Sequence, residues 1–247
     1  MINKVIYKVK SYLKLHKEKK LLKKLNLEET NLITSIKDKN LTYLSRARLA
    51  NIVYTINSTN ESKVKGMFIE AGCALGGSSI LISKLKSTNS VLNVFDVFGM
   101  IPSPTVEDTQ DVHNRYKKIV EGKSSGLGGE LYYGYENNLY DKVINSFKSF
   151  NVYPDKENVN LIEGLVQETM VITEPVVFAH IDVDWYDPVK TCLQQIWPNL
   201  VKGGSLILDD YHDWGGCRKA TDEYFRNFVG EFSTDDSYGS MKITRIK

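Results

Sequence analysis

Acidic residues stand at the ends of four apolar segments that read as β-strands. They are Glu70, Asp96, Asp182 and the pair Asp209–Asp210. Ligands of an open parallel sheet bind beyond the carboxyl ends of its strands, so these acids would gather where a ligand binds. Helix capping could account for one or two of them. Carboxylates that collect at one edge of a sheet need water, a partner or a metal ion, and we therefore expect a binding site there.

The segment after the first of these strands is a glycine-rich turn, Glu-Ala-Gly-Cys-Ala-Leu-Gly-Gly-Ser-Ser at residues 70–79. Its G-x-x-x-G-G spacing differs from the G-x-G-x-x-G of dinucleotide-binding turns, and no Lys-Ser/Thr follows as in a P-loop. Glycines let the backbone approach a ligand, and the N–H groups of the helix that follows can hold an anion. Asp96, at the end of the second strand, is placed to accept hydrogen bonds from ribose hydroxyls. Together, the turn and this acid predict a nucleoside cofactor.

Two later segments carry further acids: His-Ile-Asp-Val-Asp-Trp-Tyr-Asp at 180–187 and Leu-Asp-Asp-Tyr-His at 208–212. Asp182 and Asp209 are expected at neighbouring strand ends, where converging carboxylates repel one another unless a cation lies between them. Carboxylate oxygens prefer hard ions such as Mg²⁺ or Mn²⁺, and the sequence has no Cys/His set with zinc-site spacing. The pattern predicts a divalent metal site. The alternative is a network of helix caps and salt bridges to the Arg-Lys pair at 218–219.

The elements that must position these residues alternate along the chain. Strands are expected at residues 64–69, 91–95, 159–162, 176–181, 205–208 and 241–246. Helices are expected at residues 41–56, 79–85, 109–120, 138–150, 188–197 and 217–228. This alternation predicts an α/β fold, a doubly wound and mostly parallel sheet with both faces covered by helices.

The connection between the second and third strands, residues 99–158, is far longer than a compact strand–helix unit needs. We therefore expect a functional insertion. Residues 122–134 are rich in glycine and contain tyrosines, which favours a mobile lid over the binding site. A poorly packed surface loop is the alternative.

The first 40 residues differ in charge from the rest of the chain. They hold 11 lysines and 4 acids, a net charge of +7, so the remaining 207 residues carry −5. Apolar residues recur at steps of three and four within residues 1–25, which predicts a basic amphipathic helix. We expect this helix to pack against a second subunit of a homo-oligomer, because its stripe lacks the Trp or Phe of interfacial anchors. A peripheral contact with an anionic membrane surface is the alternative. The sequence thus divides into an arm, 1–40, and a domain, 41–247.

Composition excludes several classes of protein. The mildly acidic domain does not have the charge of a nucleic-acid-binding protein. No apolar run approaches the roughly 18–20 residues of a spanning helix, and no cleavable signal is expected at the start. Three cysteines without a C-x-x-C pair argue against a disulfide framework. These features favour the reducing cytoplasm, at the inner face of the membrane if the arm binds lipid.

The motifs taken together resemble the macrocin O-methyltransferase family. The resemblance rests on strand-E-x-G-x-x-x-G-G-S-S, an acid ending the second strand, I-D-x-D-x-Y, and G-G-x-x-I-x-D-D-Y, and it spans roughly residues 41 to 228. It implies a Rossmann-like class I methyltransferase with a seven-stranded sheet. It also implies that S-adenosylmethionine and Mg²⁺ (or Mn²⁺) take part in methylating a sugar hydroxyl.

The resemblance also implies roles for individual residues. The expected cofactor-binding residues are Glu70, Gly72, Gly76, Gly77, Ser78, Asp96 and Gly164. The expected metal ligands are Asp182, Asp209 and Asp210, with Asp184 in or beside that shell. A general base must also take the proton of the hydroxyl. Asp184 and His212 are favoured for this role because their motifs place them near the expected metal, with His113 as a further candidate and His180 in the core.

Two segments match no family pattern: residues 211–214 (Tyr-His-Asp-Trp) and residues 126–134. Both would lie near the acceptor, so the identity of the sugar-type or similar small polar acceptor stays open. Two other functions stay open as alternatives, a hydroxylase or oxygenase on the same scaffold and a non-catalytic nucleoside-binding subunit. The glycine spacing disfavours an NAD-dependent dehydrogenase.

Overall fold

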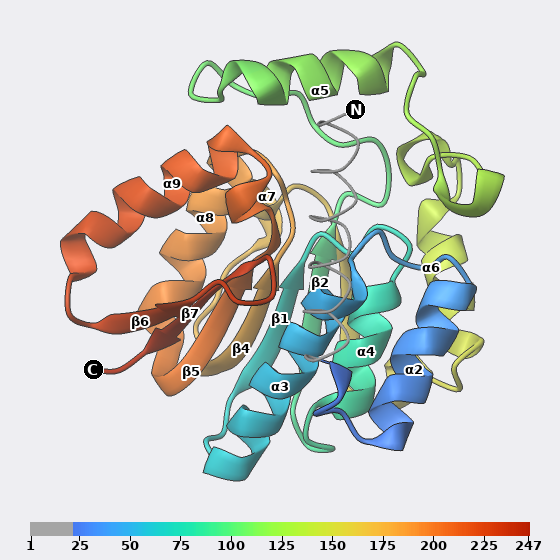
Figure 1. Cartoon of the computed structure of the whole chain (residues 1–247). Coiled ribbons are helices and arrows are strands. Elements are labelled where there is room, and N and C mark those ends of the chain that lie inside the picture. Colours follow the sequence, from blue (N-terminus) through green and yellow to red (C-terminus); the bar gives the residue numbers. More distant parts are fainter. Residues whose placement is uncertain (1–21) are drawn as a thin grey trace, which may run out of the picture.

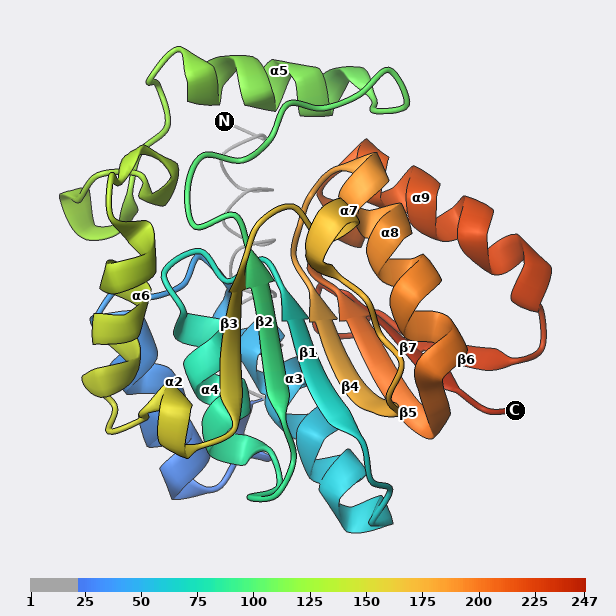
Figure 2. The same ribbon diagram turned by 180° about the vertical axis from the view of Figure 1, so that it is seen from behind.

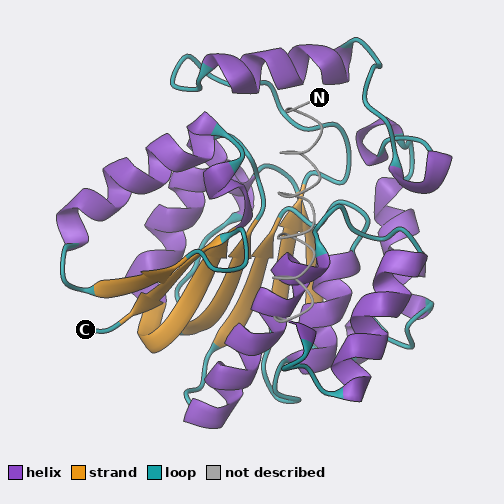
Figure 3. Cartoon of the chain, in the orientation of Figure 1, coloured by secondary structure: helices purple, strands orange, loops and turns teal. Residues whose placement is uncertain are grey.

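A seven-stranded sheet forms the centre of the computed structural model, which describes residues 22–247. The strand order is β3-β2-β1-β4-β5-β7-β6, and helices cover both faces (Figure 3). The first five strands in chain order are parallel, whereas β7 and β6 run antiparallel. The prediction of a doubly wound, mostly parallel α/β sheet is confirmed. The helix expected within residues 1–25 lies almost wholly outside the described residues.

Most elements lie where they were expected, but α3 begins and ends later than the helix expected at 41–56, and β5 begins earlier than the strand expected at 205–208. The strands are β1 (Met67–Ala71), β2 (Leu92–Asp96), β3 (Val159–Glu163), β4 (Val176–Ile181), β5 (Leu200–Leu208), β6 (Phe232–Asp235) and β7 (Met241–Arg245). The helices are α2 (Leu27–Asp38), α3 (Arg46–Ser62), α4 (Gly77–Leu85), α5 (Gln110–Val120), α6 (Leu139–Lys148), α7 (Val166–Thr169), α8 (Tyr186–Ile196) and α9 (Gly215–Phe225). β6 and α7 were not expected, because a four-residue strand and a single helical turn carry too few residues to show a period.

The strands send successive side chains to opposite faces of the sheet, which gives two cores. On β1, Phe68 packs in one core and Ile69 in the other. The first core lies under α2, α3, α4 and α6, and the second under α7, α8 and α9 (Figures 1 and 2). Ile33 and Ile36 of α2 are buried in the first core, so the described end of the predicted arm packs against the domain.

Strand register brings the acidic motifs to one edge. Ala71 pairs with Ile181, and Ile181 pairs with Leu208. Asp182 and Asp209 follow directly after two paired residues, so they lie at neighbouring strand ends as expected. Among residues 22–247, no helix is both long and apolar enough to cross a membrane.

The long insertion crosses this same edge, and α5 lies above the carboxyl ends of the strands (Figures 1 and 2). Its start is anchored by two carboxylates. Asp108 Oδ1 accepts a hydrogen bond from the N–H of Tyr186 at 2.8 Å, and Asp111 Oδ2 accepts one from the N–H of Gly215 at 3.0 Å. Tyr186 and Gly215 begin α8 and α9, and the N-cap residues of those helices give no side-chain cap of their own. The insertion therefore caps two helices that lie far along the chain.

Two glycines allow this close approach. A Cβ at Gly215 would overlap the side chain of Thr109, and a Cβ at Gly216 would overlap the carboxylate of Asp108. The Gly-Gly pair at the start of α9 is thus a docking surface for the insertion. This part of the insertion is a packed strap rather than a loose loop.

Candidate active site

A cavity of about 400 Å³ opens at the carboxyl ends of the strands, a size suited to a small molecule. We divide its lining into three parts. The glycine-turn wall comprises Gly72, Ala74, Phe95, Asp96, Val97, Gly164 and Leu165. The acid floor comprises Asp182, Asp184, Asp209 and Asp210. The insertion wall comprises Ile101, Pro102, Asp108, Arg115, Tyr132 and Tyr133, with Tyr43, Arg48, Trp185 and Trp214 beside it.

Asp96 organises the glycine-turn wall. Its Oδ2 accepts hydrogen bonds from the N–H groups of Cys73 (2.6 Å) and Ala74 (3.2 Å), and its Oδ1 accepts one from Phe98 (2.8 Å). Burial raises the pKa of Asp96, and these hydrogen bonds oppose the rise. A carboxylate has about four acceptor positions, so this one keeps capacity for a ligand on the cavity side.

Gly72 and Gly164 allow a ligand to approach the backbone of the same wall closely. Gly72 has φ +83°, and a Cβ there would overlap the carbonyl of Asp182 at the end of β4. Gly164 has φ +136° and follows β3. A side chain at either position would be strained. Of the seven residues expected to bind the cofactor, these two and Asp96 line the cavity.

The other four expected cofactor residues have different surroundings. Glu70 is fully buried; it accepts a hydrogen bond from Ser79 Oγ and lies 2.9 Å from His180 Nδ1. The N–H of Gly77 donates to the carbonyl of Leu41 at 2.9 Å. Neither these two residues nor Gly76 and Ser78 are among the lining residues. Their direct contact with a cofactor remains a prediction.

The acid floor contains a cluster suited to a metal ion. Asp182, Asp184 and Asp210 each place a carboxylate oxygen within 4.8 Å of the other two. Burial and the neighbouring Asp209 raise the pKa of Asp182 to about 8, and burial raises that of Asp184 to about 6. Asp210 Oδ2 is buried without a hydrogen-bond partner. Three converging carboxylates with an unsatisfied oxygen fit a hard divalent cation.

Asp184 has an unusual backbone. Its φ is +57°, in the left-handed region that a residue with a Cβ seldom adopts. Such strain costs roughly 1–3 kcal/mol and concentrates at functional sites. Here it turns the carboxylate of Asp184 into the cluster, next to the end of β4.

The set of clustered acids differs from the expected one at a single position. Asp209 was expected to join Asp182 and Asp210, but its Oδ2 lies 2.6 Å from Nη1 of Arg48. Its Oδ1 is buried without a hydrogen-bond partner, 4.0 Å from His180 Nε2. Since one oxygen is occupied by a guanidinium, Asp184 takes the third place in the cluster.

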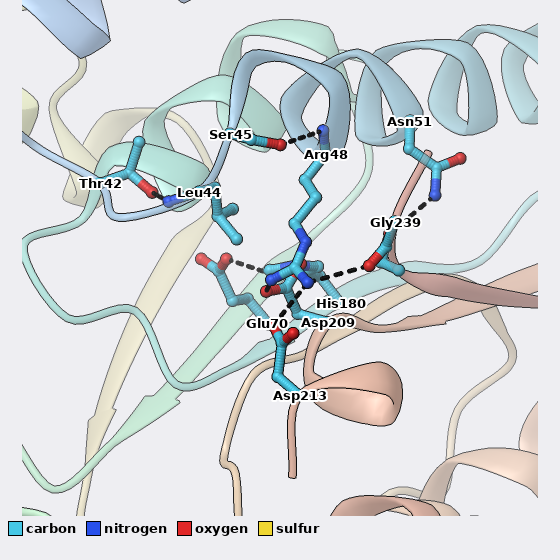
Figure 4. Close-up of polar contacts among 11 residues, drawn as sticks. Thr42, Leu44, Ser45, Arg48, Asn51, Glu70, His180, Asp209, Asp213 and Gly239 are labelled. Atoms are coloured by element: carbon cyan, nitrogen blue, oxygen red, sulfur yellow. Dashed lines mark hydrogen bonds and ion pairs between the residues drawn. The ribbon is translucent and has the colours of Figure 1, made fainter. Parts of the chain in front are cut away.

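Arg48 is a site residue that sequence reasoning missed. It reaches from α3 to Asp209, to Asp213 (2.5 Å) and to the carbonyl of Gly239 (2.9 Å), as Figure 4 shows. No motif signals it, because an arginine in a helix far from the acids looks like a solvated residue. His180 lies beneath this network; burial lowers its pKa, but Asp209 and Glu70 outweigh that effect and raise it to about 10.

The candidate bases differ in whether they line the cavity. Asp184 lines the cavity, but His212 and His113 are not among the lining residues. His212 instead lies 3.6 Å from Asp236 and packs edge-on against Tyr211. Within the described chain, Asp184 is therefore the favoured base with direct access to a ligand.

Aromatic rings flank the acid floor on two sides. Tyr132 lies 4.5 Å from Tyr133, and Tyr43 lies 5.8 Å from Tyr133, measured between ring centroids. Trp185 and Trp214, which also line the cavity, meet edge-on at 6.1 Å. Rigid aromatic walls with a few placed polar groups are typical of small-molecule sites.

Comparison with known proteins adds the decisive observation. A family model described as Macrocin-O-methyltransferase (TylF) matches residues 4–230. The chain belongs to the macrocin O-methyltransferase family. The demethyldecarbamoylnovobiocin O-methyltransferase of Streptomyces niveus is 25% identical over 194 residues, which are 76% of this chain and 68% of that protein. A second relative, the 8-demethyl-8-(2,3-dimethoxy-alpha-L-rhamnosyl)-tetracenomycin-C 4'-O-methyltransferase of Streptomyces olivaceus, is also 25% identical, over 74% of this chain and 67% of its own length.

Solved structures agree on the fold. The O-methyltransferase NovP superposes with a TM-score of 0.70 at 20% identity and covers 84% of this chain and 83% of its own. The SAH-bound methyltransferase PaMTH1 of Podospora anserina gives a TM-score of 0.54 at 14% identity, covering 100% of this chain and 97% of its own. The resemblance inferred from the motifs is confirmed, and with it the class I methyltransferase fold. The protein is an O-methyltransferase, which sets the hydroxylase and non-catalytic alternatives aside.

Proposed function

We propose that this protein transfers the methyl group of S-adenosylmethionine to a hydroxyl of a sugar-type acceptor, and that the reaction depends on a divalent cation held by the acid floor. The observation that carries the proposal is the position of three clustered carboxylates between the glycine-turn wall and the aromatic insertion wall. The Streptomyces olivaceus relative is named for a substrate that carries a rhamnosyl group, which supports a sugar as the acceptor class.

The glycine-turn wall is suited to the cofactor. Asp96 can accept a hydrogen bond from a ribose hydroxyl on its cavity side while its other positions hold the turn in place. Gly72 and Gly164 leave room for the cofactor to lie against the backbone. Gly72 is packed directly against the backbone carbonyl of Asp182, so a cofactor bound at this wall would lie next to the acid floor.

The acid floor is suited to Mg²⁺ or Mn²⁺. Asp182 and Asp210 would hold the ion together with Asp184, and Asp209 offers a buried free oxygen beside them. When bound, such an ion lowers the pKa of an acceptor hydroxyl and fixes its position. Burial, and then repulsion between the carboxylates, raises the pKa values of Asp182 and Asp210, and the charge of the ion would relieve that repulsion.

Proton removal falls to Asp184 in this proposal. Asp184 lines the cavity, so an ionised carboxylate there has an oxygen that can take the acceptor proton. Bound S-adenosylmethionine would supply the methyl group, which the hydroxyl oxygen would take as the carbon–sulfur bond breaks, leaving S-adenosylhomocysteine as the product. Tyr132, Tyr133, Trp185 and Trp214 would orient the acceptor and limit the access of water.

We also propose a cytoplasmic enzyme that forms a homo-oligomer through residues 1–25, with no role in nucleic-acid binding. Cys73, Cys192 and Cys217 are buried and unpaired, which supports a reducing compartment. Deletion of residues 1–25 should lower the mass found by light scattering. Loss of binding to anionic vesicles at unchanged mass would instead identify a peripheral membrane contact.

The test of the proposed function combines calorimetry with a transfer assay. The full chain should bind S-adenosylmethionine and S-adenosylhomocysteine in preference to NAD. With Mg²⁺ present, it should add one methyl group to a member of a panel of glycosides, seen as a mass increase of the sugar. Preferential binding of NAD, or transfer confined to acceptors without a sugar, would contradict the proposal.

A further inference from the structure

Two arginines line the cavity, and their surroundings differ. Arg48 donates to two carboxylates, those of Asp209 and Asp213, and to the carbonyl of Gly239. Arg115, on α5, donates from Nη1 to the hydroxyl of Ser124 at 2.9 Å. Among residues 22–247, no carboxylate lies within 4.0 Å of its guanidinium.

The guanidinium of Arg115 is held rather than mobile. Its central carbon lies 5.7 Å from the centroid of the Tyr132 ring, whose residue is only 3% exposed. Stacking of this kind orients the plane of the guanidinium. An arginine has five N–H donors, and the bond to the neutral hydroxyl of Ser124 leaves most of them for a ligand.

The charge of Arg115 also acts across the cavity. It opposes the rise in the pKa of Asp184 on the acid floor and of Tyr43 at the mouth. The other acids of α5 and its start are occupied elsewhere, since Asp108 and Asp111 cap α8 and α9. A positive charge with no carboxylate of residues 22–247 within 4.0 Å therefore lines the cavity where the acceptor would lie.

We propose that Arg115 binds an anionic group of the acceptor, a phosphate or a carboxylate, and so selects acidic or phosphorylated sugars over neutral ones. This inference rests on the proposed function, because it takes the acceptor to be the molecule whose hydroxyl is methylated. Planar guanidinium donors match the oxygens of both groups in bidentate fashion. The rings of Tyr132 and Tyr43 line the cavity beside Arg115, where the neutral part of a sugar would rest.

The experiment compares three probes on the full chain loaded with S-adenosylhomocysteine: glucose 1-phosphate, methyl glucuronide and methyl glucoside. Calorimetry should show the anionic probes binding at least about tenfold more tightly than the neutral one, as expected for charge-assisted bonds. Arg115→Gln should remove this preference while leaving the affinity for methyl glucoside and for S-adenosylhomocysteine unchanged. Arg115→Lys should restore part of it, because the charge is kept.

Two controls separate Arg115 from other sources of anion binding. Lys118→Gln removes one positive charge from the exposed face of the same helix and should leave the preference intact. Titrations with Mg²⁺ and with EDTA distinguish a phosphate held by Arg115 from one held by the metal. The protein can prefer only one of the two anionic probes. If Arg115→Gln removes that preference, the anionic group of that probe, phosphate or carboxylate, is the one that Arg115 binds.

Several results would overturn the inference. They are equal affinity for the three probes, absence of binding by both anionic probes, and a preference that survives Arg115→Gln. These outcomes are distinct from failure of the proposed function. If the chain does not bind S-adenosylhomocysteine, the function fails, but the same titrations without it still report on Arg115.

Discussion

The turn of the glycine-turn wall is held by residues near one another in sequence, whereas the insertion wall is held by distant ones. Asp96 holds its turn through residues no more than 23 positions away. Asp108 reaches Tyr186 across 78 positions, and Trp185 Nε1 donates to the carbonyl of Pro102 across 83. The turn beside Asp96 therefore needs only β1, β2 and the loops after them, with Gly164 and Leu165 added from the end of β3, but the insertion wall needs the start of α8 in place.

This difference implies a division of labour. The cofactor side is fixed by a short motif, so it can stay constant while the insertion changes. The acceptor side depends on a few long-range contacts of a strap, so changes there can alter the acceptor without disturbing cofactor binding. The acid floor lies between the two walls and should serve both.

The largest effect is expected on the acid floor. Asp182→Asn and Asp210→Asn should each lower methyl transfer by roughly two to three orders of magnitude, because a catalytic metal contributes several kcal/mol. Cofactor affinity should change little, since neither side chain belongs to the glycine-turn wall. Asp222→Asn, an exposed acid of α9 outside the cavity, is the matched control and should keep wild-type turnover.

Metal titrations of two further variants identify the third acid of the cluster. If Asp184 completes the cluster, Asp184→Asn should weaken metal binding and Asp209→Asn should leave it nearly intact. The reverse order would show that Asp209 leaves Arg48 to bind the ion. Either result is read from metal affinity, so it does not depend on which acid removes the proton.

A smaller effect, confined to the first wall, is expected for Asp96→Ala. Loss of its charged hydrogen bonds should weaken S-adenosylmethionine binding by about 10- to 100-fold, or about 1.5–3 kcal/mol. Anionic-probe binding on the insertion wall should remain. Asn93→Ala, which breaks a bond to Asn160 at the exposed side of β2 and β3, should leave cofactor affinity unchanged. Equal losses in the two variants would refute a cofactor role for Asp96.

The complementary change on the second wall is Asp108→Ala. Loss of the cap on α8 should cost about 0.5–2 kcal/mol of stability and raise the KM of the acceptor, with cofactor affinity preserved. Glu107→Gln removes only an exposed ion pair with Lys219 and should do neither. A drop in cofactor affinity in Asp108→Ala would show that the two walls are not independent.

The smallest expected effect is the change in thermal stability of the metal-free protein with pH. A carboxyl group whose pKa is raised in the folded chain stabilises the fold at low pH, and this contribution is lost as the pH rises through the raised value. With Asp184 near 6 and Asp182 near 8, the Tm in EDTA should fall between pH 5.5 and pH 8.5. Mg²⁺ should raise the Tm more at pH 8.5 than at pH 5.5. A metal effect that is equal at both pH values would argue against binding at these acids.

The sequence predicts the two walls unequally for the same physical reason. Apolar strand patterns and the G-x-x-x-G-G turn are local, so the sheet, the turn and the role of Asp96 as a strand-end acid follow from the sequence. Parallel strands also bring Asp182 and Asp209 to one edge, which follows from topology alone. The partners of individual side chains do not follow, because Arg48 meets Asp209 across 161 positions of sequence.

The insertion is likewise predicted only in part. Its length and glycine content predict a segment over the site, and α5 does cross the strand ends. That Asp108 and Asp111 would cap α8 and α9 could not be predicted, since those helices begin with Tyr186 and Gly215 far along the chain. The mobility expected for residues 122–134 remains a prediction, to be tested by proteolysis with and without ligands.

The most direct test of the central claim is a titration of Mn²⁺ into the full chain, followed by electron paramagnetic resonance and matched to methyl transfer. The account predicts a single bound ion, lost in both Asp182→Asn and Asp210→Asn, with turnover abolished by EDTA and restored in proportion to occupancy. Full turnover in excess EDTA, or ion binding that survives both substitutions, would contradict it.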